Sequence, residues 1–219
     1  CAPASSVAMK MVSSPWMLPT TSGQLARSMA TATLPAAPVE VRMTVIEGPA
    51  VRISRTKRAM VEKWSCTGAM AAVLGAEDAL VDEVCREASQ DGVVVPANHN
   101  SPGQIVIGGH AAAVDRALAL LGGRGVRKAV KLAVSVPSHT PLMREAANRL
   151  GEAMADVAWN EPSIPVVQNV DAEVHQGIQA IRDALVRQLY LPVQWTGCVQ
   201  ALATAGATRI GECGPGKVL

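Results

Sequence analysis

Aromatic side chains are scarce in this sequence. Only 2% of its 219 residues are aromatic, namely four Trp and one Tyr, and there is no Phe. The hydrophobic share of 49% therefore comes almost entirely from aliphatic residues, and these must build the core. Sites for single-stranded nucleic acids stack bases on aromatic rings, so this kind of site is disfavoured.

The sequence also lacks an excess of charge of one sign. Its 20 Lys and Arg balance 18 Asp and Glu, which leaves a net charge of +2. This balance predicts no nucleic-acid partner. No apolar run approaches the roughly 18 residues that cross a membrane, so we expect no membrane partner. The high hydrophobic share excludes a wholly disordered chain.

Cysteine and histidine patterns typical of bridges or metal ligands are missing. The five cysteines are odd in number and none forms a CxxC pair, while the four histidines form no HxH or HxxxH pair. We therefore predict no disulfide framework and no metal site. A reducing, cytoplasmic environment is the corresponding expectation.

Residues 1–65 differ in composition from the remainder. They hold eight basic and three acidic residues, against 12 basic and 15 acidic residues in 66–219, and no acidic residue precedes Glu40. The segment shows no helical or strand periodicity. Three interpretations are open: a targeting leader, a disordered tail, or a stretch that is not in the native frame of its gene.

From Gly68 to Ser135 apolar runs and helical periodicities alternate. Strands are predicted over 69–75, 93–98, 104–108 and 128–135, and helices over 77–88 and 111–121. The order β-α-β-β-α-β within about 70 residues is that of the ferredoxin-like unit. After Pro137, helices over 142–157, 178–189 and 195–205 and strands over 164–170 and 208–214 predict a parallel α/β layer.

Three strings are candidates for a functional site. His139 lies in a loop between a predicted strand and helix, where histidines act as general bases or simply cap the helix. The stretch 98–104 is an Asn-rich turn that either satisfies its own backbone or faces a ligand. The stretch 182–190 is an amphipathic helix with a charged face.

Taken together, several strings resemble bacterial malonyl-CoA:acyl-carrier-protein transacylase over Thr67–Leu219. They occur in the order and at the spacing of that family: TGAMAAVLG (67–75), NHNSPGQ (98–104), SVPSH (135–139), PVVQNVD (165–171), IRDALVRQLY (181–190), PVQW (192–195) and GPGKVL (214–219). The resemblance implies an α/β fold, with a hydrolase-like parallel-sheet large domain that is incomplete here and an inserted ferredoxin-like subdomain. The implied division is an unmatched segment at 1–66, the small subdomain at 67–135, and the C-terminal part of the large domain at 136–219.

The resemblance also implies a reaction. In the family, a serine of a G-x-S-x-G turn takes malonyl from malonyl-CoA and passes it to the phosphopantetheine thiol of acyl carrier protein, without a bound cofactor and as a monomer. His139 corresponds to the general base, Gln188 to an active-site residue and Asn100 to a ligand contact. His99 stands where the family usually has Phe, so we expect the local packing to differ there.

The nucleophile of that reaction is missing. No G-x-S-x-G string occurs in the sequence. The corresponding stretch, at roughly 25–35, holds Ser28 without either flanking glycine, so we identify no nucleophile. The family's P-G-Q-G-S-Q string is absent too, and the surroundings of Arg55 do not match those of the family's carboxylate-binding arginine.

The missing family strings suggest how the gene was altered and leave two functions open. We expect a coding frame shifted upstream of Thr67 in a gene truncated at both ends, no evolved fold in 1–65, and a poorly stable chain with exposed sheet edges. The chain is then either a malonyl acyltransferase or a catalytically dead fragment or carrier-binding remnant that keeps His139 and Gln188. A free-standing ferredoxin-like regulatory domain would explain only 68–135.

Overall fold

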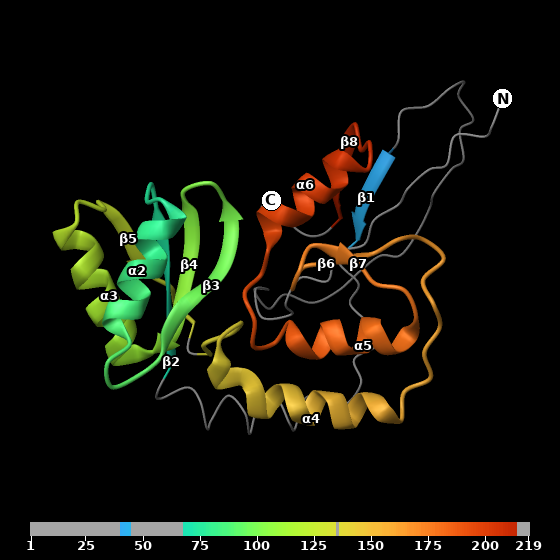
Figure 1. Cartoon of the computed structure of the whole chain (residues 1–219), viewed down its shortest axis with the longest axis horizontal. Coiled ribbons are helices and arrows are strands. Elements are labelled where there is room, and N and C mark those ends of the chain that lie inside the picture. Colours follow the sequence, from blue (N-terminus) through green and yellow to red (C-terminus); the bar gives the residue numbers. More distant parts are fainter. Residues whose placement is uncertain (1–39, 45–67, 135, 214–219) are drawn as a thin grey trace.

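The computed structural model describes residues 40–44, 68–134 and 136–213. Figure 1 shows two regions side by side: a sheet with two helices, and a mostly helical region built from the C-terminal part of the chain.

The first region is a four-stranded sheet in the order β3-β4-β2-β5. The strands are β2 (Gly68–Leu74), β3 (Val94–Ser101), β4 (Gln104–His110) and β5 (Lys128–Lys131), and each neighbouring pair is antiparallel. The strands expected from the sequence are confirmed, except that the last one ends at Lys131 and does not reach Ser135.

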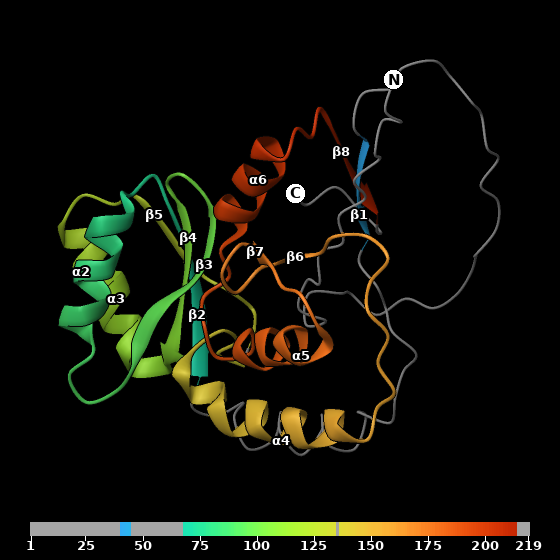
Figure 2. The same ribbon diagram turned by 45° about the vertical axis from the view of Figure 1, so that its right-hand side comes forward.

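Helices α2 (Asp78–Ala88) and α3 (Ala111–Gly123) cover one face of this sheet, as expected from their periodicity (Figure 2). Alternate strand residues point toward them because successive side chains of a strand face opposite sides. The resulting core is aliphatic and closed, with fully buried side chains from both layers: Val73, Ile105 and Ile107 from the strands, and Val81, Val84, Val114 and Leu121 from the helices.

The opposite face of the sheet packs against the chain that follows β5. Met70, Ala97 and Val106 form a second, smaller cluster on this face. A Cβ atom on Gly108 would lie 3.0 Å from Cγ2 of Thr140, so the glycine allows the loop around residue 140 to approach the strand closely. The loop around residue 140 therefore packs directly against this face of the sheet.

The second region begins with a 3-10 turn, η1 (Pro141–Met143), that continues into α4 (Arg144–Ala155). It continues through the short strands β6 (Val167–Gln168) and β7 (Glu173–Val174), and the helices α5 (Ile178–Arg187) and α6 (Trp195–Thr204). All three expected helices are present. α4 and α5 lie side by side in both views (Figures 1 and 2).

The strand expected over 164–170 is wrong in extent and in pairing. Only Val167 and Gln168 are extended, and they pair antiparallel with β7 in a tight hairpin. Pro165 has no N–H to donate, which keeps a regular ladder from extending upstream. The expected strand near 208–214 is present as β8 (Arg209–Cys213).

β8 has a parallel partner, β1 (Glu40–Thr44), with Glu40 opposite Arg209 and Thr44 opposite Cys213. β1 belongs to the segment 1–66 for which we expected no native fold, and its five residues are the ones the structure describes there. The remaining residues of that segment lie outside the described part. No helix of the described residues is long and apolar enough to cross a membrane.

Candidate active site

His139 occupies an unusual backbone conformation at the boundary of the two regions. Its φ is +60°, a left-handed value that a non-glycine residue rarely adopts. Its backbone N–H donates to the Leu189 carbonyl at 3.0 Å, and its side chain is buried. Such strain persists only where neighbouring contacts fix the residue, and it is typical of functional sites.

A hydrogen bond defines the orientation and the tautomer of the His139 ring. Its Nδ1 lies 2.7 Å from the main-chain carbonyl oxygen of Gln188. A carbonyl only accepts, so Nδ1 of the neutral ring carries the hydrogen and Nε2 carries the lone pair. This is the tautomer in which Nε2 accepts a proton from a substrate or a nucleophile.

Burial sets the charge of this ring. Removal from water disfavours the imidazolium and lowers the pKa of His139 below its usual value, and the hydrogen bond to Gln188 opposes this only in part. The ring is therefore neutral near pH 7, as a general base must be.

Gln188 follows the last residue of α5 and is itself buried. Its N–H donates to the Ala184 carbonyl at 2.9 Å, which continues the helical hydrogen-bond pattern by one residue. In this position the carbonyl of Gln188 itself points at the His139 ring. His139 and Gln188 are 49 residues apart in the sequence, and the fold brings them together. Their catalytic roles stay predictions.

The loop that carries His139 is fixed from within. Oγ1 of Thr140 donates to the Pro137 carbonyl at 2.7 Å, and the Met143 N–H donates to the Thr140 carbonyl at 2.9 Å. Thr140 is fully buried against Gly108 of the sheet. The sheet region and the loop together hold the ring in place.

Asn100 lies at the end of β3, half-buried, and makes no hydrogen bond to His139 or Gln188 in the described structure. Its neighbour His99 donates its backbone N–H to the Val193 carbonyl at 2.9 Å, so the end of β3 lies beside the segment that follows Gln188. The His99 ring, at the position where we expected altered packing, is 3.2 Å from the Asp78 carboxylate. A ligand contact at Asn100 stays a prediction.

Two residues that we compared with the family's nucleophile and carboxylate-binding arginine lie outside the described residues: Ser28 and Arg55. Among the residues that the structure does describe, no three His, Cys, Asp or Glu side chains gather as metal ligands. The buried thiols of Cys85 and Cys198 have their pKa raised to about 12, chiefly by burial, so neither is a ready thiolate nucleophile.

An ion-pair cluster at the end of α5 was missed from the sequence. Arg187 donates to Oδ2 of Asp171 at 2.8 Å, and Nε2 of His175 lies 3.0 Å from the same oxygen. The four-residue spacing of Asp171 and His175 was a weak signal, but nothing in the sequence connected either residue to Arg187.

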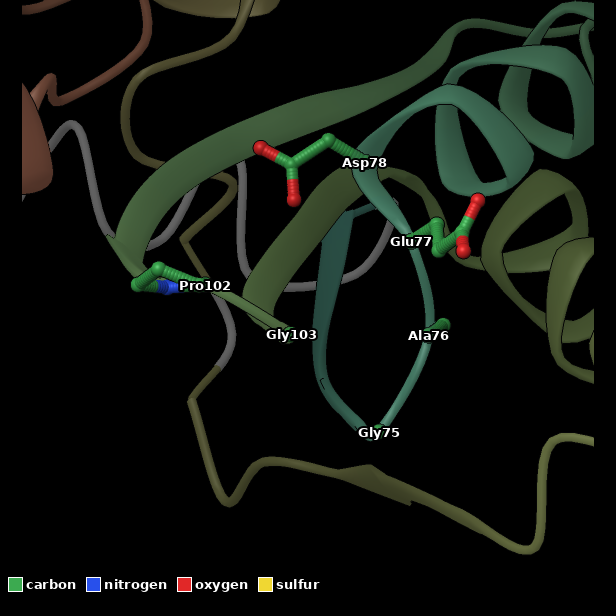
Figure 3. A pocket seen from close by; sticks show the side chains of 6 residues that line it. All are labelled: Gly75, Ala76, Glu77, Asp78, Pro102 and Gly103. Carbon is green, nitrogen blue, oxygen red and sulfur yellow. The ribbon is translucent and has the colours of Figure 1, made fainter.

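A shallow surface hollow lies elsewhere, between the start of α2 and the β3–β4 turn (Figure 3). Its lining comprises Gly75, Ala76, Glu77, Asp78, Pro102 and Gly103. The acidic side chains of Glu77 and Asp78 point in different directions in this view. The lining includes neither His139 nor Gln188, so the hollow is separate from the candidate active site.

Comparison of the sequence with known protein families identifies the class of protein to which this chain belongs. A family described as "Acyl transferase domain" matches residues 34–211, most of the chain. The chain therefore belongs to the acyl transferase domain family. The match begins at residue 34, upstream of Thr67.

Individual proteins similar to this chain indicate which acyl transferases it resembles. Malonyl CoA-acyl carrier protein transacylase of Escherichia coli K12 is 52% identical over 153 residues, which are 70% of this chain and 50% of that protein. The crystal structure of malonyl-CoA:acyl carrier protein transacylase from Xanthomonas oryzae is 80% identical with a TM-score of 0.68, over 69% of this chain and 48% of that one.

A further solved structure contains a carrier protein. It is a malonyl-transacylase in complex with a holo type II PKS acyl-carrier protein, 36% identical with a TM-score of 0.71, over 83% of this chain and 64% of that one. The resemblance read from the sequence is thus confirmed. The chain spans about half the length of the curated relatives it matches.

Proposed function

We propose that this chain transfers a malonyl group from malonyl-CoA to the phosphopantetheine thiol of acyl carrier protein through a malonyl-serine ester, with His139 as the general base. The observation that carries the proposal is the buried His139 ring with Nδ1 held by the Gln188 carbonyl at 2.7 Å. The names of the relatives supply the substrate and the carrier.

In the proposed reaction a serine hydroxyl attacks the malonyl thioester carbon. Its proton moves to Nε2 of His139 and then to the departing CoA thiolate as the C–S bond breaks. In the second half, the carrier thiol gives its proton to Nε2, its sulfur attacks the malonyl ester, and the serine oxygen recovers the proton. The Gln188 carbonyl stabilises the ring while it is positively charged.

The surroundings of this step are part of the proposal. Asn100, at the end of β3, would contact the ligand. The strand order β3-β4-β2-β5, with both helices on one face, supports assigning 67–135 to the ferredoxin-like class. The resemblance of the sequence is the support for assigning 136–219 to the C-terminal part of a hydrolase-like large domain. We further propose that the protein is a cytoplasmic monomer. It would act without a resident cofactor or metal and without a nucleic-acid partner.

A second candidate is a catalytically dead fragment, or a module that binds the carrier without turnover. The observation that favours it is the absence of a G-x-S-x-G string anywhere in the 219 residues. This candidate keeps the same His139 and Gln188 geometry and differs only in lacking the group that begins the reaction.

The experiment that separates the two is the intact mass of the chain after incubation with malonyl-CoA, followed by peptide mapping. A malonyl ester on a serine, which disappears when holo-acyl carrier protein is added, supports the transfer reaction. The His139→Ala variant should then form the adduct far more slowly. A folded wild-type sample without any adduct contradicts the transfer reaction and favours the dead fragment or non-catalytic module.

A further inference from the structure

The carbonyls that hold His139 belong to a short segment, 187–194, that is anchored at both of its ends. Gln188 accepts from the His139 ring and Leu189 from the His139 backbone N–H, at 2.7 and 3.0 Å. Since both acceptors are consecutive main-chain groups, the position of this segment decides whether the ring keeps its orientation.

Both anchors lead to the turn between β6 and β7. At the start of the segment, the Arg187 side chain donates to Oδ2 of Asp171 at 2.8 Å. At its end, the Gln194 N–H donates to the Asn169 carbonyl at 2.7 Å. One four-residue stretch, 169–172, thus holds the segment from either side of the two carbonyls.

The turn itself is rigid enough to serve this purpose. Ala172 is held at φ +61° while its N–H donates to the Gln168 carbonyl at 2.8 Å. The Asp171 carboxylate is fixed from a second direction by the His175 ring, at 3.0 Å, and is about three-quarters buried. Partial burial strengthens a charge-assisted hydrogen bond relative to an exposed one.

Arg187 also organises the backbone beyond α5. Its carbonyl accepts from the N–H groups of Tyr190 and Leu191, at 3.1 and 3.0 Å. A shift of Arg187 would therefore move the carbonyls of Gln188 and Leu189 with it.

From these contacts we infer that Asp171 and Arg187 form a positioning pair, which acts through the Gln188 carbonyl to hold the His139 ring in its Nδ1–H tautomer. Neither side chain touches the reacting atoms. The inference rests on the proposed role of His139 as base, but its test does not need turnover.

The test is the ¹⁵N–¹H imidazole spectrum of the full chain, with His139 identified by the loss of its signals in His139→Gln. Wild type should show a single Nδ1–H tautomer for His139. In Asp171→Asn the carboxylate that binds Arg187 is lost, and we expect mixed-tautomer shifts for His139. Asp171→Glu restores the carboxylate and should restore the wild-type pattern in part.

A matched control is Asp115→Asn, which removes the carboxylate charge of the Lys131–Asp115 pair, also 2.8 Å long, in the sheet region. It should leave the His139 signals unchanged. If Asp171→Asn does not fold, Arg187→Met is measured in its place, since it keeps an aliphatic side chain but has no N–H to donate to Asp171.

A wild-type His139 pattern in folded Asp171→Asn, or in Arg187→Met where the first variant does not fold, overturns the inference. Failure of the proposed function has a different signature: no malonyl adduct forms on wild type, whatever the tautomer. The two results are read on separate samples and do not depend on each other.

Discussion

The sheet region and the helical region of this chain bury their apolar side chains in different ways. Two helices close one face of the β2–β5 sheet over a single cluster of fifteen buried residues. Among the described residues, the core around α6 has three buried members, Val167, Cys198 and Leu202. The sheet region is thus a self-contained unit, whereas the region that carries Gln188 depends on loops, ion pairs and neighbouring segments for its geometry.

The largest expected effect comes from truncating each core in turn. Ile107→Ala leaves a cavity in the closed core and should lower the free energy of unfolding of the sheet region by about 2–5 kcal/mol. Leu202→Ala should instead deprotect mainly the amides of α6, because its buried cluster is small within the part of the chain that the structure describes. Native-state hydrogen exchange measures both. Equal deprotection of both regions by either variant would show that the chain unfolds as one unit.

The next effect tests how closely the strands of the sheet region approach. A Cβ on Gly109 would lie 2.0 Å from the Val93 carbonyl oxygen, so Gly109→Ala must displace backbone, at a cost of about 1–3 kcal/mol. Gly122→Ala in α3 is the matched control, because nothing lies near its added methyl group and alanine favours the helix. Urea titration should show a loss for the first variant and a small gain for the second.

A smaller effect concerns pH and the boundary between the regions. The pKa of His139 is lowered from its ordinary value of 6.5, so on acidification the unfolded chain takes up a proton that the folded chain refuses. The free energy of unfolding therefore falls below that pH, with a slope of at most about 1.4 kcal/mol per pH unit from this group, and is unaffected above it.

The contribution of His139 is isolated by comparison with His139→Gln, through urea titrations from about pH 5 to pH 8. The difference between the free energies of unfolding of the two proteins should change only on the acidic side, where wild type loses stability relative to His139→Gln. Parallel pH profiles would show that the ring is not protected from protonation in the folded chain.

The smallest effect is expected at the surface of the sheet region. Lys131 and Asp115 form an ion pair with both side chains about half exposed, so Asp115→Asn should change the free energy of unfolding by no more than about 1 kcal/mol. Thermal unfolding at low and high salt measures it. A larger loss would mean that the sheet region relies on surface charge as well as on its closed core.

Prediction from the sequence succeeded where a repeating pattern was sufficient. The strands of the sheet region and all five expected helices follow from apolar periodicity, because alternate residues of a strand and every third or fourth residue of a helix must face the same core. It failed at residues 164–170, where a short apolar run became a two-residue strand in a hairpin. Periodicity over so few residues does not distinguish a strand from an irregular segment.

The candidate site divides along the same line. The residues alone indicated His139 as a loop histidine, and the family strings indicated Gln188 and Asn100. The contact between His139 and Gln188 could not be predicted, because it joins the His139 ring to a main-chain carbonyl and every residue has such a carbonyl. The Arg187–Asp171 pair was missed for a related reason: both belong to strings that were interpreted as a whole, as a charged helix face and as a family motif.

By itself the sequence determined the secondary structure of 68–134, the aliphatic nature of the core and the lack of a G-x-S-x-G nucleophile turn, because these depend on residue type and spacing. Only the tertiary structure decided the tautomer of His139, its burial and its strained backbone. Those properties arise where the sheet, the 137–143 loop and the end of α5 meet. Hydrogen bonds to main-chain carbonyls that are distant in the sequence leave no pattern in the residue types.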